Sequence, residues 1–358
     1  MTSEIAAPPA IVMAKQLARL DAGCVTILAN SPIAGFGYLA ADGHRRATFV
    51  GGTPGFARVH SPGRISFALP AGEPPPADRT GVSFVFLLPG IGETLRVNGA
   101  AAGRKGVELT VDVREAYVHC ARCVLRSRLW HPIATRTPDF LAAAPFLVLS
   151  TGDRDGGSDT SPRGDEPGFA RRLDDTTLAI PDRRGNRRAD TLRNLEQDDR
   201  IAFAALRPHS GDVLHGYGTA TRSTDPALLA TMTLRGVPPQ RALLIHVEAM
   251  EARPSEAVRR SRLWSPSSRV DTAAVPDLIA LAARHGAINQ KNLLGLLMRR
   301  LAGWPRLTRR IIDLGYCRQL RQEGYTHANP TWSTPAQETV PPPSTGRIVP
   351  VTYSAPTR

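Results

Sequence analysis

A repeated pair of short motifs constrains the fold of this chain more than any other feature of its sequence. The pentapeptide PGFAR at 54–58 recurs at 167–171, and RSRLW at 126–130 recurs at 260–264. Both motifs keep the same order, and an internal repeat on this scale indicates that one structural unit has been duplicated.

A longer match between the two motifs strengthens this interpretation. The segment 84–101 (FVFLLPGIGETLRVNGAA) aligns with 203–220 (FAALRPHSGDVLHGYGTA), and two glycines of each copy coincide, Gly92 with Gly211 and Gly99 with Gly218. Three ordered matches predict two copies of one domain, which we place at 24–132 and 138–266.

The copies differ in length at two places. The second copy spans 22 positions over 181–203, whereas the first spans 14 over 70–84. It also spans 42 positions over 218–260, whereas the first spans 27 over 99–126. The second copy therefore carries two insertions, and its functional residues are to be sought near them.

Each copy has the pattern of short strands joined by turns, because Gly and Pro number 31 each and interrupt the apolar runs. The strand candidates of the second copy are 146–150, 177–180, 201–206, 213–219 and 243–248. Helices are predicted at 10–20, 138–143, 188–196 and 226–234. The fold class is therefore mainly β with α (α+β), with a small β-barrel in each copy.

The chain changes character after the second RSRLW motif. We predict helices at 275–284, 289–301 and 307–323, of which the second is basic and amphipathic. These form a helical extension at 275–325, while 1–23 holds the N-terminal helix. Residues 326–358 are rich in Pro, Thr and Ser, which predicts a disordered tail.

The positive charge is unevenly distributed along the chain. The net charge is +13, and 291–358 alone holds 10 Lys and Arg against 3 Asp and Glu, a net +7. A basic end on a mildly basic body makes nucleic acid an unlikely partner. No apolar run is long enough to span a membrane. Four cysteines and the absence of a signal-peptide pattern at the start favour the cytoplasm.

The most informative chemistry lies in the first insertion of the second copy. The strand-like TTLAIP leads into a loop with Gly185 and four arginines, Arg183, Arg184, Arg187 and Arg188, before a helix starts. A helix N-terminus with nearby guanidinium groups suits a phosphate. Ser161, Arg163 and Gly164 form a second cationic turn upstream. Alternatively, these arginines pair with Asp182, Asp190 and Asp198 on the surface, and spacing alone does not decide between the two interpretations.

The segments SDTSPRGDEPGF, TLAIPDRRGNRRADTLRNL and RSRLW together resemble the pyridoxamine 5′-phosphate oxidase-like family of FMN-binding split barrels. The resemblance covers almost all of the second copy and the later half of the first. It implies a six-stranded split β-barrel that dimerises and binds FMN between two barrels. It also implies that the FMN phosphate and ribityl chain are held by Ser161, Arg163, Gly164, Asn186, Arg187, Arg188 and Thr191.

The two copies complement each other. The first has a short, Pro-rich segment (AGEPPPADRT) in place of the arginine loop, and the second lacks the run AYVHCARC that precedes RSRLW in the first. We therefore expect two tandem split barrels that form a pseudo-dimer within one chain and bind one flavin. The second barrel would hold the phosphate, and the first would contribute His119, Arg126 and Arg128.

The function expected from this resemblance is an FMN-dependent oxidoreductase acting on a small-molecule substrate with an electron acceptor, without an identified catalytic residue. The alternatives are a non-enzymatic flavin or haem binding protein, a deazaflavin-dependent reductase, and a regulatory protein that uses the basic tail. Cys120 and Cys123 form a lone CxxC, and we expect no metal site because structural zinc needs four ligands. Association into higher oligomers is left open.

Overall fold

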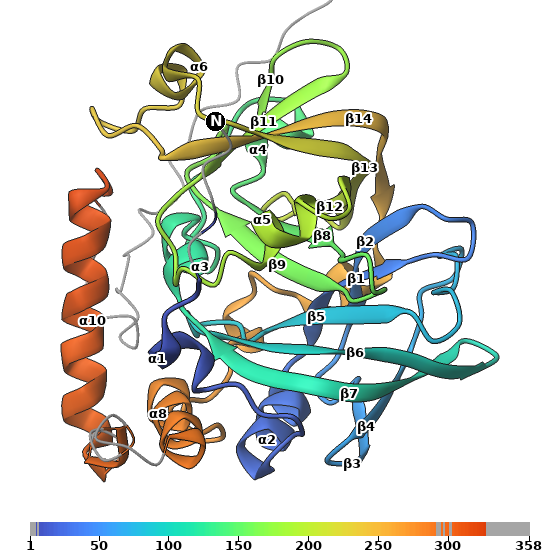
Figure 1. The fold of residues 1–358 in the computed structure, drawn as a ribbon, viewed down its shortest axis with the longest axis vertical. Helices are drawn as coiled ribbons and strands as arrows, with labels where there is room; N and C mark the ends of the chain where they lie inside the picture. Colours follow the sequence, from blue (N-terminus) through green and yellow to red (C-terminus); the bar gives the residue numbers. More distant parts are fainter. Residues whose placement is uncertain (1–4, 6, 291–294, 296–297, 301–302, 327–358) are drawn as a thin grey trace, which may run out of the picture.

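The computed structural model describes residues 5, 7–290, 295, 298–300 and 303–326. It is built on two seven-stranded antiparallel sheets, which lie one above the other in Figure 1. The first has the order β2-β1-β5-β6-β7-β4-β3. Its strands are β1 (Ile33–Leu39), β2 (Arg45–Gly51), β3 (Arg58–Ser61), β4 (Arg64–Ala68), β5 (Gly81–Leu87), β6 (Thr94–Lys105) and β7 (Glu108–His119).

The second sheet has the order β10-β11-β14-β13-β12-β8-β9. Its strands are β8 (Phe146–Thr151), β9 (Asp159–Gly164), β10 (Arg171–Arg172), β11 (Thr177–Asp182), β12 (Arg200–Leu206), β13 (Asp212–Ser223) and β14 (Arg241–Pro254). Read from the other edge, this is the order of the first sheet with seven added to each strand number. The fold is thus two split β-barrels in tandem, and their matching topology supports the predicted repeat.

The aligned glycines Gly99 and Gly218 mark the same irregularity in both sheets. The register shifts between Asn98 and Gly99 in β6 and between Tyr217 and Gly218 in β13. A Cβ atom at Gly99 would collide with the carbonyl oxygen of Asp112, and one at Gly218 with that of His246. Each bulge requires glycine because the neighbouring strand's backbone leaves no room for a side chain.

The two insertions of the second copy are the segments that contain α5 (Asp190–Leu195), between β11 and β12, and α6 (Pro226–Thr231), between β13 and β14. Short helices α3 (Arg122–Arg126) and α7 (Glu256–Ser261) enter the two RSRLW motifs at equivalent positions, and neither was predicted. Each barrel has seven strands rather than the six implied by the resemblance, since the short β3 and β10 add one strand to each sheet.

The predicted helix 10–20 is wrong beyond its first turn. Only α1 (Ala10–Met13) forms, because Leu17 bridges to Ala116 of β7 through both backbone groups, which an α-helix would not allow. A separate helix, α2 (Ala22–Asn30), follows. The other predicted helices correspond to α4 (Phe140–Ala143), α8 (Leu278–Asn289) and α10 (Pro305–Gln322). The predicted helix 289–301 falls mostly, and the predicted tail almost entirely, outside the described residues.

The two barrels pack through a buried apolar layer to which both contribute. It joins Phe49 and Val85 of the first barrel with Phe146 and Val148 of the second. Gly35 faces Val148 so closely that a Cβ atom there would overlap that side chain. Because this layer is continuous, the barrels form one packed body in which a cavity can be shared.

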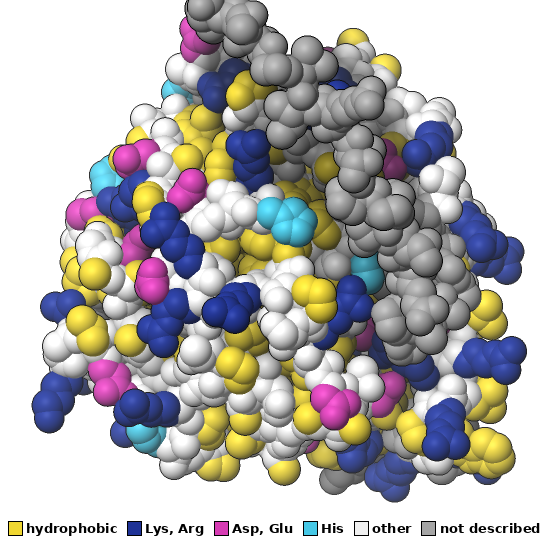
Figure 2. Space-filling view, turned by 180° about the vertical axis from the view of Figure 1, so that it is seen from behind, with side chains coloured by type: hydrophobic (Ala, Val, Ile, Leu, Met, Phe, Trp, Pro, Cys, Tyr) yellow, Lys and Arg dark blue, Asp and Glu magenta, His cyan; other side chains and the backbone are white. Residues whose placement is uncertain are grey.

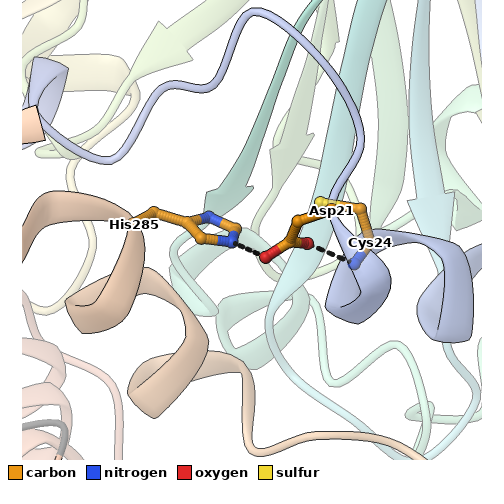
Figure 3. Close-up of side chains that lie close together, drawn as sticks. All are labelled: Asp21, Cys24 and His285. Atoms are coloured by element: carbon orange, nitrogen blue, oxygen red, sulfur yellow. Dashed lines mark hydrogen bonds and ion pairs between the residues drawn. The ribbon is translucent and has the colours of Figure 1, made fainter. Parts of the chain in front are cut away.

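Helix α8 is anchored to the start of α2 (Figure 3). The Asp21 carboxylate caps α2 by accepting a hydrogen bond from the Cys24 amide at 2.8 Å, and it lies 2.9 Å from Nε2 of the fully buried His285. The ligand-capable atoms of Asp21, Cys24 and His285 lie within 4.8 Å of one another. The Asp21 contacts tie the C-terminal helices to the first barrel.

No helix among the described residues is long and apolar enough to cross a membrane.

Candidate functional site

A cavity of about 490 Å³ opens between the two barrels. The first barrel supplies its wall from β6, the end of β7 and α3, and the second supplies β9, the loop after β11 and the start of α5. Nine of the ten residues predicted to bind a cofactor line it: Ser161, Arg163, Gly164, Asn186, Arg187, Arg188, Thr191, His119 and Arg126. Residues up to 72 positions apart in sequence (His119 to Thr191) and from different barrels thus meet at one place.

Arg128 is the predicted residue that does not line this cavity. It is half-buried and has a left-handed backbone with φ of 50°, as does its counterpart Arg262 in the second RSRLW motif, with φ of 47°. The shared conformation at equivalent positions points to a turn that both barrels use. This turn explains why the motif is repeated in both barrels, and the explanation requires no contact of Arg128 with the cavity.

The predicted cationic turn at 161–164 is instead the end of strand β9, which lies against α5 at the cavity. Nη2 of Arg163 donates to Oγ1 of Thr191 at 3.2 Å, so two predicted residues 28 positions apart are in contact. Gly164 faces the carbonyl of Cys123 from the first barrel, and a Cβ atom there would collide with it. The glycine therefore permits the two barrels to approach at the floor of the cavity.

The loop between β11 and α5 has a strained backbone. Arg187 and Ala189 adopt left-handed conformations, with φ of 63° and 57°. The Asn186 side chain accepts a hydrogen bond from the Arg188 amide at 3.0 Å, which fixes the turn between them. Left-handed residues other than glycine cost free energy and are concentrated at ligand sites, where surrounding contacts hold them.

Five of the arginines around the cavity are already paired with carboxylates. Arg96 pairs with Asp159, Arg126 with Glu323, Arg183 with Asp165 at 2.8 Å, Arg188 with Asp190 at 2.7 Å, and Arg241 with Asp182 at 3.7 Å. The surface-pairing interpretation therefore holds for part of the cluster. Arg188 and Arg126 shape the wall, and their charges are largely compensated.

Four cavity arginines have no carboxylate partner among the described residues: Arg122, Arg163, Arg184 and Arg187. Arg122 donates instead to the Gly185 carbonyl and to the Gln319 side chain. Arg163 bonds only Thr191 and the carbonyl of Pro162, and its Nε is buried without a partner. Arg184 and Arg187 are exposed at the rim. Uncompensated guanidinium groups around one cavity attract an anion, and their forked donors suit phosphate or carboxylate oxygens.

His119 presents a second unsatisfied group at the cavity wall. Its Nδ1 atom is buried and has no hydrogen-bond partner in the described structure. Burial, followed by the positive charges of Arg96 and Lys15, holds the pKa of His119 well below its ordinary value. The ring is therefore neutral at physiological pH and can offer one donor and one acceptor to a polar ligand.

The sequence analysis missed Arg96, which is fully buried in β6 and reaches across to the second barrel. It pairs with Asp159, and its Nη1 donates to Oγ of Ser161 at 3.2 Å. The sequence signal that could have identified Arg96 is its position as the one charged residue within the otherwise uncharged strand segment TLRVNGAA. Arg96 holds Ser161 in place and thereby links the first barrel to the predicted phosphate turn.

The same interface has a counterpart on its other side, lined by Arg46, Glu73, His215 and Arg253. Its volume is about 250 Å³, roughly half that of the first cavity. Nε2 of His215 lies 3.1 Å from Oγ1 of Thr48. In the alignment of the two copies, His215 corresponds to Arg96 and Thr48 to Ser161, so this contact is equivalent to the Arg96–Ser161 contact.

In this smaller cavity an acidic side chain occupies the position that corresponds to the arginine loop. The nearly buried Glu73 carboxylate lies 3.5 Å from Nη2 of Arg253 and accepts a hydrogen bond from the Tyr38 hydroxyl at 3.3 Å. It comes from the short Pro-rich segment that replaces the arginine loop. A fixed carboxylate repels an anion, so the two cavities are chemically different.

The residues around the larger cavity fit a flavin nucleotide in two respects, their orphaned polar atoms and their uncompensated charge. Arg163 Nε, His119 Nδ1 and Asn186 Nδ2 are buried polar atoms without partners, and all three residues line it. Buried polar groups are almost always hydrogen-bonded in native proteins, so three orphans around one cavity indicate a polar ligand. The uncompensated arginines add the charge that a phosphate requires.

Cys120 and Cys123 also line this cavity, and all four cysteines of the chain are free thiols. Burial raises the pKa of Cys123 to about 12, so this thiol stays protonated at physiological pH. A protonated thiol is a poor nucleophile and a poor metal ligand. Cys123 is therefore a packing residue on the buried face of α3.

The fold defines the class of the protein: a split-barrel protein with two barrels in one chain. Residues 135–253, within the second barrel, match the family model described as pyridoxamine 5′-phosphate oxidase, and this match confirms the resemblance seen in the sequence. The matched segment starts just before α4 and ends in β14. No curated protein matches the chain.

Solved structures show partial likeness to this chain. HupZ of Group A Streptococcus is 21% identical over 34% of this chain and 95% of its own, with a TM-score of 0.28. A pyridoxamine 5′-phosphate oxidase-related, FMN binding protein from Nostoc punctiforme is 15% identical over 39% and 82%, with a TM-score of 0.25. General stress protein 26 of Bacillus anthracis is 17% identical over 32% and 90%, with a TM-score of 0.25. Likeness at this level supports no transfer of activity.

Proposed function

We propose that this chain binds one FMN in the larger inter-barrel cavity and acts as an FMN-dependent oxidoreductase on a small-molecule substrate. The observation that carries the proposal is the set of orphaned polar atoms of Arg163, His119 and Asn186 around one cavity rimmed by unpaired arginines. The family of the second barrel supports the choice of a flavin over other phosphorylated ligands.

Residues of both barrels would contact the FMN. Arg163, with Thr191 beside it, and the exposed Arg187 would bind the phosphate, and Asn186 would donate to the polar chain next to it. Ser161 already donates its proton to Asp159, so it would act toward that chain as an acceptor. His119 would place a neutral ring against the ligand from the first barrel, where its Nδ1 accepts or donates one hydrogen bond. The flavin supplies the redox chemistry when bound, and the protein supplies orientation and electrostatics.

A stoichiometry of one per chain follows from the difference between the two cavities. The smaller one has about half the volume, lacks the arginine loop and α5, and contains the Glu73 carboxylate. An intrachain pseudo-dimer of this kind replaces two equivalent sites with one complete site. Binding of two equivalents of FMN per chain would contradict this part of the proposal.

Two alternative cofactors bear on the same cavity. A deazaflavin carries a similar ring and a phosphate, so the arginine cradle accommodates it equally well. Haem fits less well, because a largely apolar plate would leave Arg163 Nε and Asn186 Nδ2 without partners, although His119 offers a ligand nitrogen. A flavin-binding protein without enzymatic activity is the remaining alternative, and only activity measurements separate it from the leading proposal.

The decisive experiment is to release and identify the ligand. The full chain would be purified, its absorbance spectrum recorded, and the cofactor identified by mass after denaturation. FMN at about one equivalent per chain is the result expected. Oxidation of a reduced nicotinamide with an added electron acceptor then tests the oxidoreductase role. A chain that stays colourless after incubation with FMN, deazaflavin and haem would refute the site assignment.

A cytoplasmic location is part of the proposal. All four cysteines are free in the structure, which suits a reducing compartment. Fractionation of cells that produce the chain, followed by a thiol-labelling assay, tests it.

A further inference from the structure

Helix α10 stands at one edge of the molecule, beside α3 and α8 (Figure 1). Its inner face is firmly docked. Arg309 pairs with the buried Glu93 at 3.1 Å and with Asp313 one turn along α10 at 3.2 Å, while Cys317 and Leu320 pack on Leu125 of α3. The orientation of α10 is therefore fixed by contacts on one side, and the opposite side is turned to solvent.

The outer face of α10 has an exposed apolar stripe. Trp304, Leu307, Ile311 and Leu314 expose 68%, 51%, 54% and 54% of their surface. Their spacing of three, four and three residues places them along one side of the helix. Of the ten large hydrophobic residues exposed in the described part of the chain, five lie at 304–314. Such a concentration marks an interaction surface.

The charges around this stripe are of one sign. Arg306, Arg310 and Arg318 are exposed, whereas Asp313 is turned inward to Arg309 and Glu323, just beyond the helix, is buried against Arg126. Arg299 and Arg300 add two more exposed cations before the helix. Along the edge of Figure 2 that corresponds to α10, basic and hydrophobic side chains alternate.

This pattern selects among possible occupants. A second copy of the chain would bring arginines against arginines, which disfavours self-association. The chain's own segment 327–358 carries two Arg and one Glu, so it offers no compensating negative charge. A helix that combines a Trp and aliphatic stripe with flanking arginines suits the interface of an anionic bilayer, where the side chains enter the acyl boundary and the guanidinium groups meet phosphates.

We propose that the outer face of α10 binds the surface of anionic lipid membranes. The helix would lie in the plane of the bilayer interface without crossing it. The C-terminal end of α10 contacts two residues of the larger cavity: Gln319 accepts a hydrogen bond from Arg122, and Glu323, directly after the helix, pairs with Arg126. The lipid-binding face and the wall of that cavity are thus joined through α10 and α3, and the proposal itself is independent of the cofactor's identity.

The test is co-sedimentation of the full chain with vesicles. One set would be phosphatidylcholine alone, and the other phosphatidylcholine mixed with phosphatidylglycerol, each at low and high salt. Retention on the anionic vesicles, lost on the neutral ones and weakened by salt, is the expected result. The double variant Arg306→Gln and Arg310→Gln should lower the affinity on the order of tenfold or more, since each cation contributes about 1 kcal/mol near such a surface.

A second pair of variants tests the apolar stripe. Ile311→Glu should abolish vesicle binding, whereas Leu173→Glu, an exposed apolar residue next to β10, should leave it unchanged. Both positions are exposed, so circular dichroism and thermal melting should show folded proteins. Equal binding by these two variants, or no binding of the parent chain to anionic vesicles, would overturn the proposal. Concentration-dependent dimerisation that Ile311→Glu removes would assign the face to a second copy instead.

Discussion

The guanidinium group of Arg188 in the second barrel lies over the ring of Tyr117 in the first, with its Cζ atom 3.9 Å from the ring centroid. Arg96 approaches the same ring, at 5.3 Å. Tyr117 is fully buried, so both cations contact its face away from bulk water, where such contacts are strongest. The barrel interface and the cavity wall are therefore built from the same side chains.

Replacing Arg163 with Ala should weaken FMN binding without unfolding the protein. Arg163 bonds only Thr191 and a backbone carbonyl, while its cation has no carboxylate partner among the described residues. Loss of one charge-assisted hydrogen bond of about 1.5–3 kcal/mol raises Kd by about 10- to 150-fold. Quenching of flavin fluorescence measures Kd, and Arg172→Ala, exposed on β10, is the matched control. Identical Kd values for the two variants would exclude Arg163 from the phosphate site.

Replacing Asp159 with Ala should strongly destabilise the chain. The change leaves the buried Arg96 without its counter-ion, and removal of one partner of a buried pair costs about 3–5 kcal/mol. The exposed pair of Arg64 and Asp112, at 2.8 Å, provides the control, since Asp112→Ala should cost about 0–1 kcal/mol. Urea unfolding gives both free energies. A similar loss for the two variants would mean that Arg96 finds water or another partner.

The stability of the chain should fall as the pH drops from 6.5 towards 4, in part because of His215. Burial, with Arg253 and Arg46 nearby, lowers the pKa of His215 to about 4 from 6.5. Between these pH values the unfolded chain therefore binds a proton at His215 and the folded chain does not. The free energy of unfolding is highest above pH 6.5 and decreases by up to about 3 kcal/mol as the pH falls to 4.

Denaturant unfolding at several pH values measures this dependence. His215→Gln should flatten the curve between pH 6.5 and 4, whereas the same change at the exposed His60 should leave its slope as in the parent chain. An unchanged slope in His215→Gln would assign the effect to other groups.

Replacing Asp21 should separate its cap from its contact with His285. Asp21→Asn retains the N-cap of α2 and loses the charged contact, while Asp21→Ala loses both. We expect Ala to cost about 1 kcal/mol more than Asn, the usual value of an N-cap. The hydrogen bond from His285 lowers the pKa of Asp21, so the contribution of Asp21 is present above about pH 4 and is lost as the pH falls further.

Thermal unfolding of the three proteins at neutral and acid pH tests this assignment. The parent chain should lose its advantage over Asp21→Asn in acid, because the carboxyl is then protonated. Equal melting temperatures of Asn and Ala variants would show that the cap contributes nothing.

The repeat and the site were predictable from sequence for different reasons. Motif order and the two insertions located α5 and α6, because extra residues in one copy must form structural elements that the other copy lacks. The arginine loop and the segment 161–164 were found by composition and resemblance, and both line the cavity, although 161–164 belongs to strand β9 and is not the predicted turn. Arg128 was included because it shares a motif with Arg126, yet a left-handed turn separates the two side chains.

The sequence by itself determined the two-barrel organisation, the mainly β fold and most of the residues around the cavity, because strand periodicity, glycine bulges and a cationic loop are local patterns. Only the tertiary structure decided which charged side chains are neutralised by a partner within the protein. Arg96 and Arg188 are compensated by Asp159 and Asp190, and Arg163 is not. Ion pairing depends on which side chains lie close together across the barrel interface, and spacing along the sequence does not determine that proximity.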